Sequence, residues 1–122
     1  KLAPPAGTME RYRLMEWLNF IGTELHKSFS PLFTPGMPAE AQAIYRQRLQ
    51  DRFQWLDEQL AGKSWLMSET FTVADAYLFT VTGWCKYVGV DIASLARLQD
   101  HAARTAARPA VQAALQGEGL LK

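Results

Sequence analysis

Four polar residues in the first third of the chain have types and a spacing that could bind an anion. Thr23, His26 and Lys27 follow Asn19 by four, seven and eight residues, so on a helix all four share one face. His26 and Lys27 carry donors suited to a carboxylate or a thiolate. Spacing alone favours a simpler interpretation, in which both are solvated and their charge suits a helix C-terminus. The residues by themselves leave both interpretations open.

The sequence lacks the common motifs of a self-contained active site. It has no glycine-rich nucleotide loop, no HExxH, no CxxC and no serine elbow. Cys85 is the single cysteine, and with only His26 and His101 beside it there is no ligand cluster for a metal. We therefore predict no metal, and we do not expect a complete enzyme within these residues.

Length and charge limit the class of protein. The 122 residues are 48% hydrophobic, which is enough for one compact core. Lysine and arginine total 13 and aspartate and glutamate 12, so there is no excess positive charge for nucleic acid or an anionic membrane. One cysteine and the lack of a secretory signal favour a reducing cytoplasm.

The elements that must position these residues are predicted to be about five helices and no strand. Residues 1–7 contain two adjacent prolines and are typical of a linker, and Thr8 is the expected N-cap of the first helix. Pro31, with the prolines that follow it, is expected to end that helix. A second helix is predicted from about Pro38 to Gly62, followed by a loop held to the core by residues 65–67.

The third predicted helix, residues 73–90, is apolar nearly all round and should be the central, buried one. Its start has the form of a capping box, in which Thr72 and Asp75 satisfy each other's backbone amides. A membrane span is the rival interpretation, but the segment is short and is interrupted by Gly83 and Lys86. A fourth helix is expected over 92–107, and a short fifth from Pro109 to about Gly117.

Four segments carry a family resemblance over essentially the whole chain. They are RYRLMEWLNFIGTELHKSFSPLF (11–33), WL (65–66), FTVADAYLFTVTGW (71–84) and ARPAVQAAL (107–115). Together they resemble the C-terminal domain of bacterial, beta-class glutathione transferases. The TVAD segment is shared across the wider superfamily as a folding signal, whereas ELHKSFSPLF (24–33) is more particular to the bacterial class.

The resemblance implies a two-domain enzyme in which residues 8–122 form the helical domain beside the electrophile and 1–7 the interdomain linker. A thioredoxin-like N-terminal domain, outside this chain, would bind glutathione, and the chain alone would be inactive. His26 and Lys27 inherit catalytic positions near the sulfur of glutathione, and Asn19 and Glu24 match positions that contact glutathione, in the same subunit or its partner.

Tyr77 and Trp84 match positions that line the hydrophobic substrate side of the cleft in the family. Without the resemblance, simple core packing would be the favoured interpretation of both aromatic residues. Thr72 and Asp75 are assigned to folding. Cys85 is expected to be a small buried residue, because the family's own cysteine near the thiol belongs to the other domain.

The activity that the resemblance implies is conjugation of glutathione thiolate to hydrophobic electrophiles in detoxification, by a cytoplasmic homodimer. Alternatives are a glutathione-dependent disulfide reductase, isomerase or dehalogenase, because pocket shape sets the chemistry on a shared fold. A non-catalytic helical interaction module is the alternative from another class. Such a module has no physical need for a polar cluster facing a cleft, so the HK pair favours the enzyme.

Overall fold

The structure, a computed structural model, describes residues 2–121, over which the chain is helix or connection. Lys1 and Lys122, the outer ends of the predicted linker and helical domain, lie outside the described residues. Two isolated bridges, Trp65 to Ser68 and Met67 to Thr70, are the extended pairings found in this range, and neither forms a strand. The predicted all-α class is confirmed.

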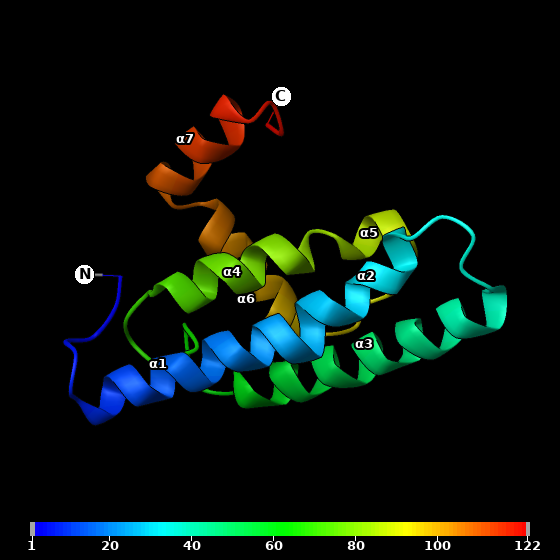
Figure 1. Ribbon diagram of the computed structural model, residues 1–122. Coiled ribbons are helices and arrows are strands. Elements are labelled where there is room, and N and C mark those ends of the chain that lie inside the picture. Colours follow the sequence, from blue (N-terminus) through cyan, green and yellow to red (C-terminus); the bar gives the residue numbers. More distant parts are fainter. Residues whose placement is uncertain (1, 122) are drawn as a thin grey trace.

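The first predicted helix is a continuous helical run of three parts, α1 (Met9–Phe20), the π-helix η1 (Ile21–His26) and α2 (Lys27–Phe33) (Figure 1). Thr8 is the N-cap as predicted, since its hydroxyl accepts a hydrogen bond from the Arg11 amide at 3.2 Å. The predicted end of this helix within the run of prolines is confirmed to within a few residues, because the helix passes through Pro31 and ends at Phe33, before Pro35 and Pro38. Pro31 removes one backbone donor close to the end, where little of the helix remains to be disrupted.

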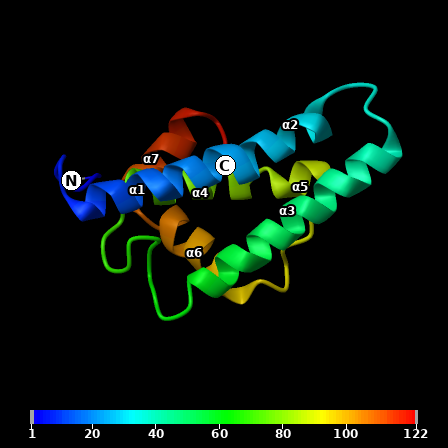
Figure 2. The same ribbon diagram turned by 60° about the horizontal axis from the view of Figure 1, so that its bottom comes forward.

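The second predicted helix is α3 (Ala39–Gln59), which runs beside η1 and α2 and packs on α1 through Trp55. Two views show the two long helical runs side by side and crossing at an angle (Figures 1 and 2). Gly62 follows α3 with a φ of 73°, a conformation that favours glycine, and so confirms the predicted stop. Leu66 is 2% exposed and holds the next loop against the core, as expected.

The third predicted helix is interrupted, which corrects the expectation of one helix over 73–90. α4 (Val73–Thr82) ends at a turn around Gly83 and Trp84, and α5 (Cys85–Val88) is a single further turn. Glycine is a poor helix former, and the Trp84 ring packs against Phe29 and Phe33 of α2 from this turn.

The last two helices follow the prediction with one shift. α6 (Ala96–Ala106) begins four residues later than expected, and its first turn is capped from another helix, because Asp57 of α3 accepts from the Leu98 amide at 2.9 Å. α7 (Pro109–Gly117) begins at Pro109 as predicted. It contacts α6 and projects away from the main bundle (Figure 1).

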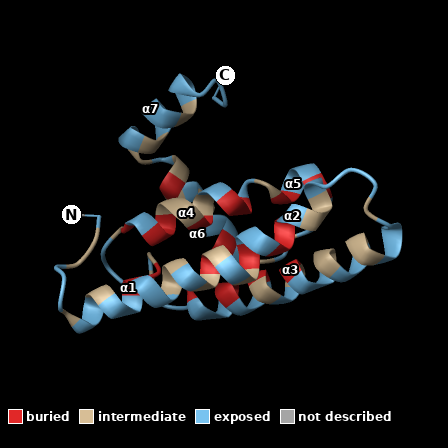
Figure 3. Cartoon of the chain, viewed as in Figure 1, coloured by how far each residue is buried: buried red, intermediate tan, exposed pale blue. Residues whose placement is uncertain are grey.

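The core lies where α1, η1, α3, α4 and α6 meet (Figure 3). The largest fully buried side chains come from these elements, from α2, and from the segment between α3 and α4. They are Leu14, Ile21, Leu25, Phe29, Leu49, Phe53, Leu56, Leu60, Leu66, Leu78, Leu98 and His101. The predicted position of α4 as the central helix is confirmed by the burial of Ala74, Leu78 and Val81.

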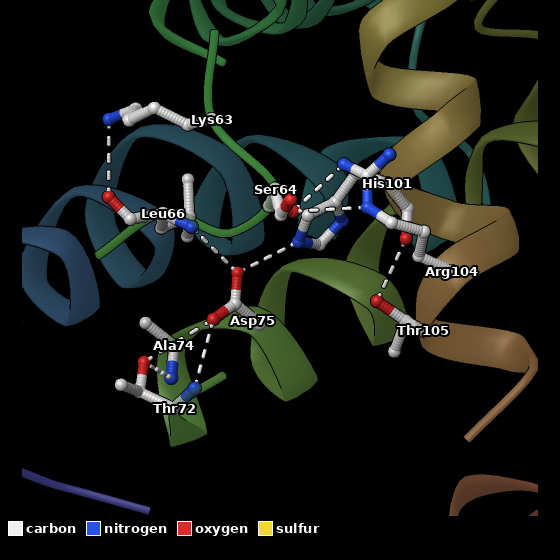
Figure 4. Close-up of polar contacts among 9 residues, drawn as sticks. All are labelled: Lys63, Ser64, Leu66, Thr72, Ala74, Asp75, His101, Arg104 and Thr105. Atoms are coloured by element: carbon white, nitrogen blue, oxygen red, sulfur yellow. Dashed lines mark hydrogen bonds and ion pairs between the residues drawn. The ribbon is translucent and has the colours of Figure 1, made fainter. Parts of the chain in front are cut away.

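The start of α4 is a capping box that also binds a loop and another helix (Figure 4). Asp75 accepts from the Thr72 amide at 3.0 Å, and the Thr72 hydroxyl accepts from the Ala74 amide at 3.2 Å. The same carboxylate accepts from the Leu66 amide at 2.9 Å and lies 2.8 Å from His101 Nε2 of α6. The predicted folding role of Thr72 and Asp75 is therefore supported by more contacts than the local motif requires.

Candidate functional site

Three of the predicted site residues, from three segments of the chain, meet at one place. His26, the last residue of η1, has its Nδ1 atom 2.5 Å from the Tyr77 hydroxyl of α4. Its ring lies edge-on to Tyr77 and to Trp84, with centroid distances of 5.7 and 5.0 Å. The first helical run therefore places the His26 imidazole between the rings of Tyr77 and Trp84 at the edge of the bundle.

An open hollow of about 420 Å³ begins at this cluster. Aromatic rings form much of its wall, and hydroxyl groups from α2 lie at the side. The lining residues are His26, Phe29, Ser30, Phe33, Thr34 and Trp84. The Phe29 and Phe33 rings each lie edge-on to Trp84, so the apolar wall is a connected aromatic surface. Tyr77 is not among the residues that line the hollow. It is connected to the hollow only through its hydrogen bond to His26, which does line it.

The remaining predicted glutathione contacts are spread along the same helical run. Lys27 and Asn19 are exposed, and over residues 2–121 neither side chain makes a hydrogen bond or an ion pair. Glu24 instead points towards α3, where it accepts from Arg52 Nε at 2.7 Å. Lys27 is followed by six more helical residues, so the interpretation of His26 and Lys27 as charges at a helix C-terminus does not describe their surroundings.

Sequence reasoning missed the part that α2 contributes to the hollow. Phe29 and Phe33 are separated by four residues, and they follow His26 by three and seven, which is the spacing of one helix face. That signal was available, but it depends on α2 continuing through Pro31. The hydrogen bond from Tyr77 to His26 has no local signal, because the two residues are 51 positions apart.

Cys85 is buried, as expected, and stands apart from the hollow. Its side chain is 2% exposed, and burial raises the pKa of the thiol from 9.0 to about 12. A thiol with this pKa is protonated and unreactive near neutral pH. Among the described residues no group of three or more histidine, cysteine or carboxylate side chains could hold a metal ion. In the same range no helix is both long and apolar enough to cross a membrane.

Comparison with known proteins gives the class to which this fold and cluster belong. Residues 38–116 match the family described as "Glutathione S-transferase, C-terminal domain". The chain belongs to the glutathione S-transferase family, and the part it represents is the helical C-terminal domain.

Individual relatives agree with this assignment. The chain is 42% identical over 120 residues to glutathione S-transferase GstA of Escherichia coli O157:H7. The aligned region is 98% of this chain and 60% of the relative. It is 47% identical, with a TM-score of 0.94, to a bacterial glutathione transferase, BphK, solved as a ternary complex, again over 98% of this chain and 60% of that one.

A third relative was solved with a ligand. The glutathione S-transferase of a sphingomonad, in complex with glutathione, is 44% identical with a TM-score of 0.92, over 98% of this chain and 59% of that one. A beta-class glutathione S-transferase from Sphingomonas chungbukensis is likewise 44% identical. The chain thus spans about 60% of the length of these relatives, and the resemblance to bacterial beta-class enzymes is confirmed.

Proposed function

We propose that this chain forms the electrophile-binding half of a glutathione transferase, which joins the thiolate of glutathione to hydrophobic electrophiles. The observation that carries the proposal is the apolar hollow of Phe29, Phe33 and Trp84 with the His26 imidazole at its edge. A site for this reaction needs an apolar surface beside a group that stabilises negative charge on sulfur. Glutathione bound to a relative that is 44% identical supports the choice of thiol.

The two halves of the site have different tasks. His26 and Lys27 are the catalytic residues of the proposal, because donors and positive charge beside the sulfur favour the thiolate, the reactive form. The aromatic wall would hold the electrophile within attacking distance, which converts a bimolecular encounter into a positioned one. Asn19 and Glu24 would contact glutathione itself, and Trp84 the electrophile. Glutathione is a co-substrate here, and no metal takes part in the proposal.

The proposal includes the rest of the protein as the family builds it. A thioredoxin-like N-terminal domain would bind glutathione, residues 1–7 would be the linker to it, and two copies would form a cytoplasmic homodimer. These statements rest on membership of the family and on the fact that the chain matches only about 60% of the length of a relative. The Leu2 carbonyl, which accepts from the Val73 amide at 2.9 Å, supports the linker role because it ties this segment to the start of α4.

The test is a conjugation assay on the protein expressed from its complete reading frame. With 1-chloro-2,4-dinitrobenzene, the sulfur–carbon bond forms, the carbon–chlorine bond breaks, and chloride leaves with the electron pair. We expect His26→Ala and Lys27→Ala to lower kcat/KM by about tenfold or more, in the range of one lost charge-assisted contact. Lys86→Ala is the matched control, because Lys86 is an exposed lysine on α5, over the Tyr87 ring.

Each outcome of this assay decides between functions. Full activity in folded His26→Ala and Lys27→Ala proteins would remove both residues from the reaction. A folded parent that does not conjugate but reduces a glutathione mixed disulfide would replace transfer by disulfide exchange. A folded parent without either activity would favour a helical interaction module.

A further inference from the structure

The Tyr77 hydroxyl contacts one ring nitrogen of His26 and leaves the other free for a ligand. The contact is to Nδ1, at 2.5 Å, and it joins η1 to α4 across the edge of the hollow. Trp84 covers the imidazole from another side, with ring centroids 5.0 Å apart. Because Nδ1 is occupied by Tyr77, Nε2 is the nitrogen that remains for a molecule in the hollow that His26 lines.

The backbone of η1 lies beside this contact. Gly22 lies one turn before His26, and a Cβ atom built on it would stand 3.7 Å from the Tyr77 hydroxyl. The hydroxyl thus rests against the helix surface, directly beside the imidazole. A π-helix has about one residue more in each hydrogen-bonded turn than an α-helix, and such segments are frequent at functional sites. Here it turns His26 towards α4 while Ile21 and Leu25 stay fully buried.

The chemistry of the two partners decides which of them donates. In a neutral imidazole one nitrogen carries the hydrogen and the other accepts, and the hydrogen bond made by one nitrogen determines the state of the other. A phenol is a better donor than acceptor, since its oxygen lone pair is delocalised into the ring, whereas a bare imidazole nitrogen is a strong acceptor. This chemistry favours donation from the Tyr77 hydroxyl to Nδ1, an arrangement in which the hydrogen of the neutral imidazole is on Nε2.

We propose that Tyr77 is a positioning residue, which holds His26 in the tautomer with hydrogen on Nε2 and presents that N–H to an anionic sulfur. This deepens the proposed function and rests on it for the identity of the anion. His26 then acts as a hydrogen-bond donor to the thiolate and does not remove the thiol proton. Tyr77 itself acts through His26, which differs from the lining role expected from its sequence position.

The tautomer of His26 is measured directly on the complete protein, uniformly labelled with ¹⁵N. Long-range proton–nitrogen correlation spectra of the neutral imidazole separate the two tautomers by the nitrogen shifts and coupling patterns. We expect His26 in the parent protein to show hydrogen on Nε2, and Tyr77→Phe to show a mixture. Hydrogen on Nδ1 in the parent protein would overturn the proposal, and that result requires no variant to fold.

Kinetics provide the second arm, with Tyr87→Phe as the matched control. Tyr87 is 65% exposed on α5, and over residues 2–121 its hydroxyl makes no hydrogen bond. We expect Tyr77→Phe to lower kcat for conjugation about fivefold, with KM for glutathione unchanged, and Tyr87→Phe to leave both unchanged. An unaltered kcat in Tyr77→Phe would overturn the positioning role. If the parent protein proves inactive, the proposed function fails, while the tautomer spectra still decide the assignment of Tyr77.

Discussion

His101 Nε2 lies 2.8 Å from Asp75 Oδ1, and both side chains are buried, at 1% and 0% exposure. An ionised carboxylate can only accept, so the imidazole donates to it, and the bond fastens α6 to the first turn of α4. Asp75 also accepts from the Leu66 and Thr72 amides. One carboxylate therefore connects the loop before α4, the cap of α4 and the middle of α6 (Figure 4).

The first prediction concerns the stability that depends on this carboxylate. Asp75→Ala leaves the Thr72 and Leu66 amides and the His101 imidazole without their partner, and the loss at Thr72 is the half of the capping box that Asp75 supplies. We expect the free energy of unfolding to fall by about 3 kcal/mol or more, since a lost cap costs about 1 kcal/mol and each unsatisfied buried group costs a similar amount or more. Urea unfolding of the complete protein measures it.

Asp100→Ala is the control for this substitution. Asp100 is an exposed aspartate in the middle of α6, one residue from His101, and it should tolerate alanine within about 0.5 kcal/mol. Equal unfolding midpoints for Asp75→Ala and the parent protein would mean that the buried bonds of Asp75 contribute nothing to stability.

The second prediction separates the electrophile from glutathione. Trp84→Leu keeps an apolar side chain but removes most of the aromatic wall beside Phe33. We expect KM for a hydrophobic electrophile to rise about tenfold, the value of one to two kcal/mol of lost aromatic contact, while KM for glutathione is unchanged. Trp55→Leu is the control, because this tryptophan of α3 is 41% exposed and packs on Trp17 and Phe20 of α1, away from the hollow. A rise in KM for glutathione instead would assign Trp84 to the other half of the site.

The third prediction concerns Cys85, whose thiol has its pKa raised to about 12 by burial. The thiolate is the species that alkylates, so iodoacetamide should leave Cys85 unmodified near neutral pH until the protein unfolds. Peptide mapping after labelling with and without denaturant measures this. Labelling of the native protein at the rate of a free thiol would show that the α5 turn opens in solution.

The same shift gives the sign of a pH effect. The unfolded thiol ionises near its ordinary value of 9.0, whereas the folded thiol holds its proton to about 12. The contribution of Cys85 to stability is therefore complete below about pH 9 and is lost as pH rises towards 12. Replacement by alanine should make the decline of stability between about pH 9 and pH 11 less steep than in the parent protein.

Local signals predicted the boundaries of most elements correctly. The cap by Thr8, the capping box of Thr72 and Asp75, and the start of α7 at Pro109 each depend on residues within one helical turn. Such signals are complete in the sequence, because the donor and the acceptor are both local.

Long-range contacts decided the features that the sequence left unpredicted. Trp84 packs on Phe29 of α2 from the turn between α4 and α5, and the tyrosine bond to His26 joins residues 51 positions apart. The π-helix had no local signal, because the steps of four that separate Ile21, Leu25 and Phe29 are an ordinary spacing for the buried face of an α-helix.

The π-helix between α1 and α2 makes this region sensitive to the number of residues in it. The π-helix contains one residue more than an α-helical segment of the same length along the helix axis. This extra residue sets the rotation of α2 relative to α1, so that α1 can face α4 while α2 faces α3. Shortening the segment by one residue would rotate Phe29 and Phe33 about 100° away from Trp84 without altering either side chain. In this helix, then, chain length specifies the pocket as much as residue identity does, and single-residue deletions would be more damaging here than most substitutions.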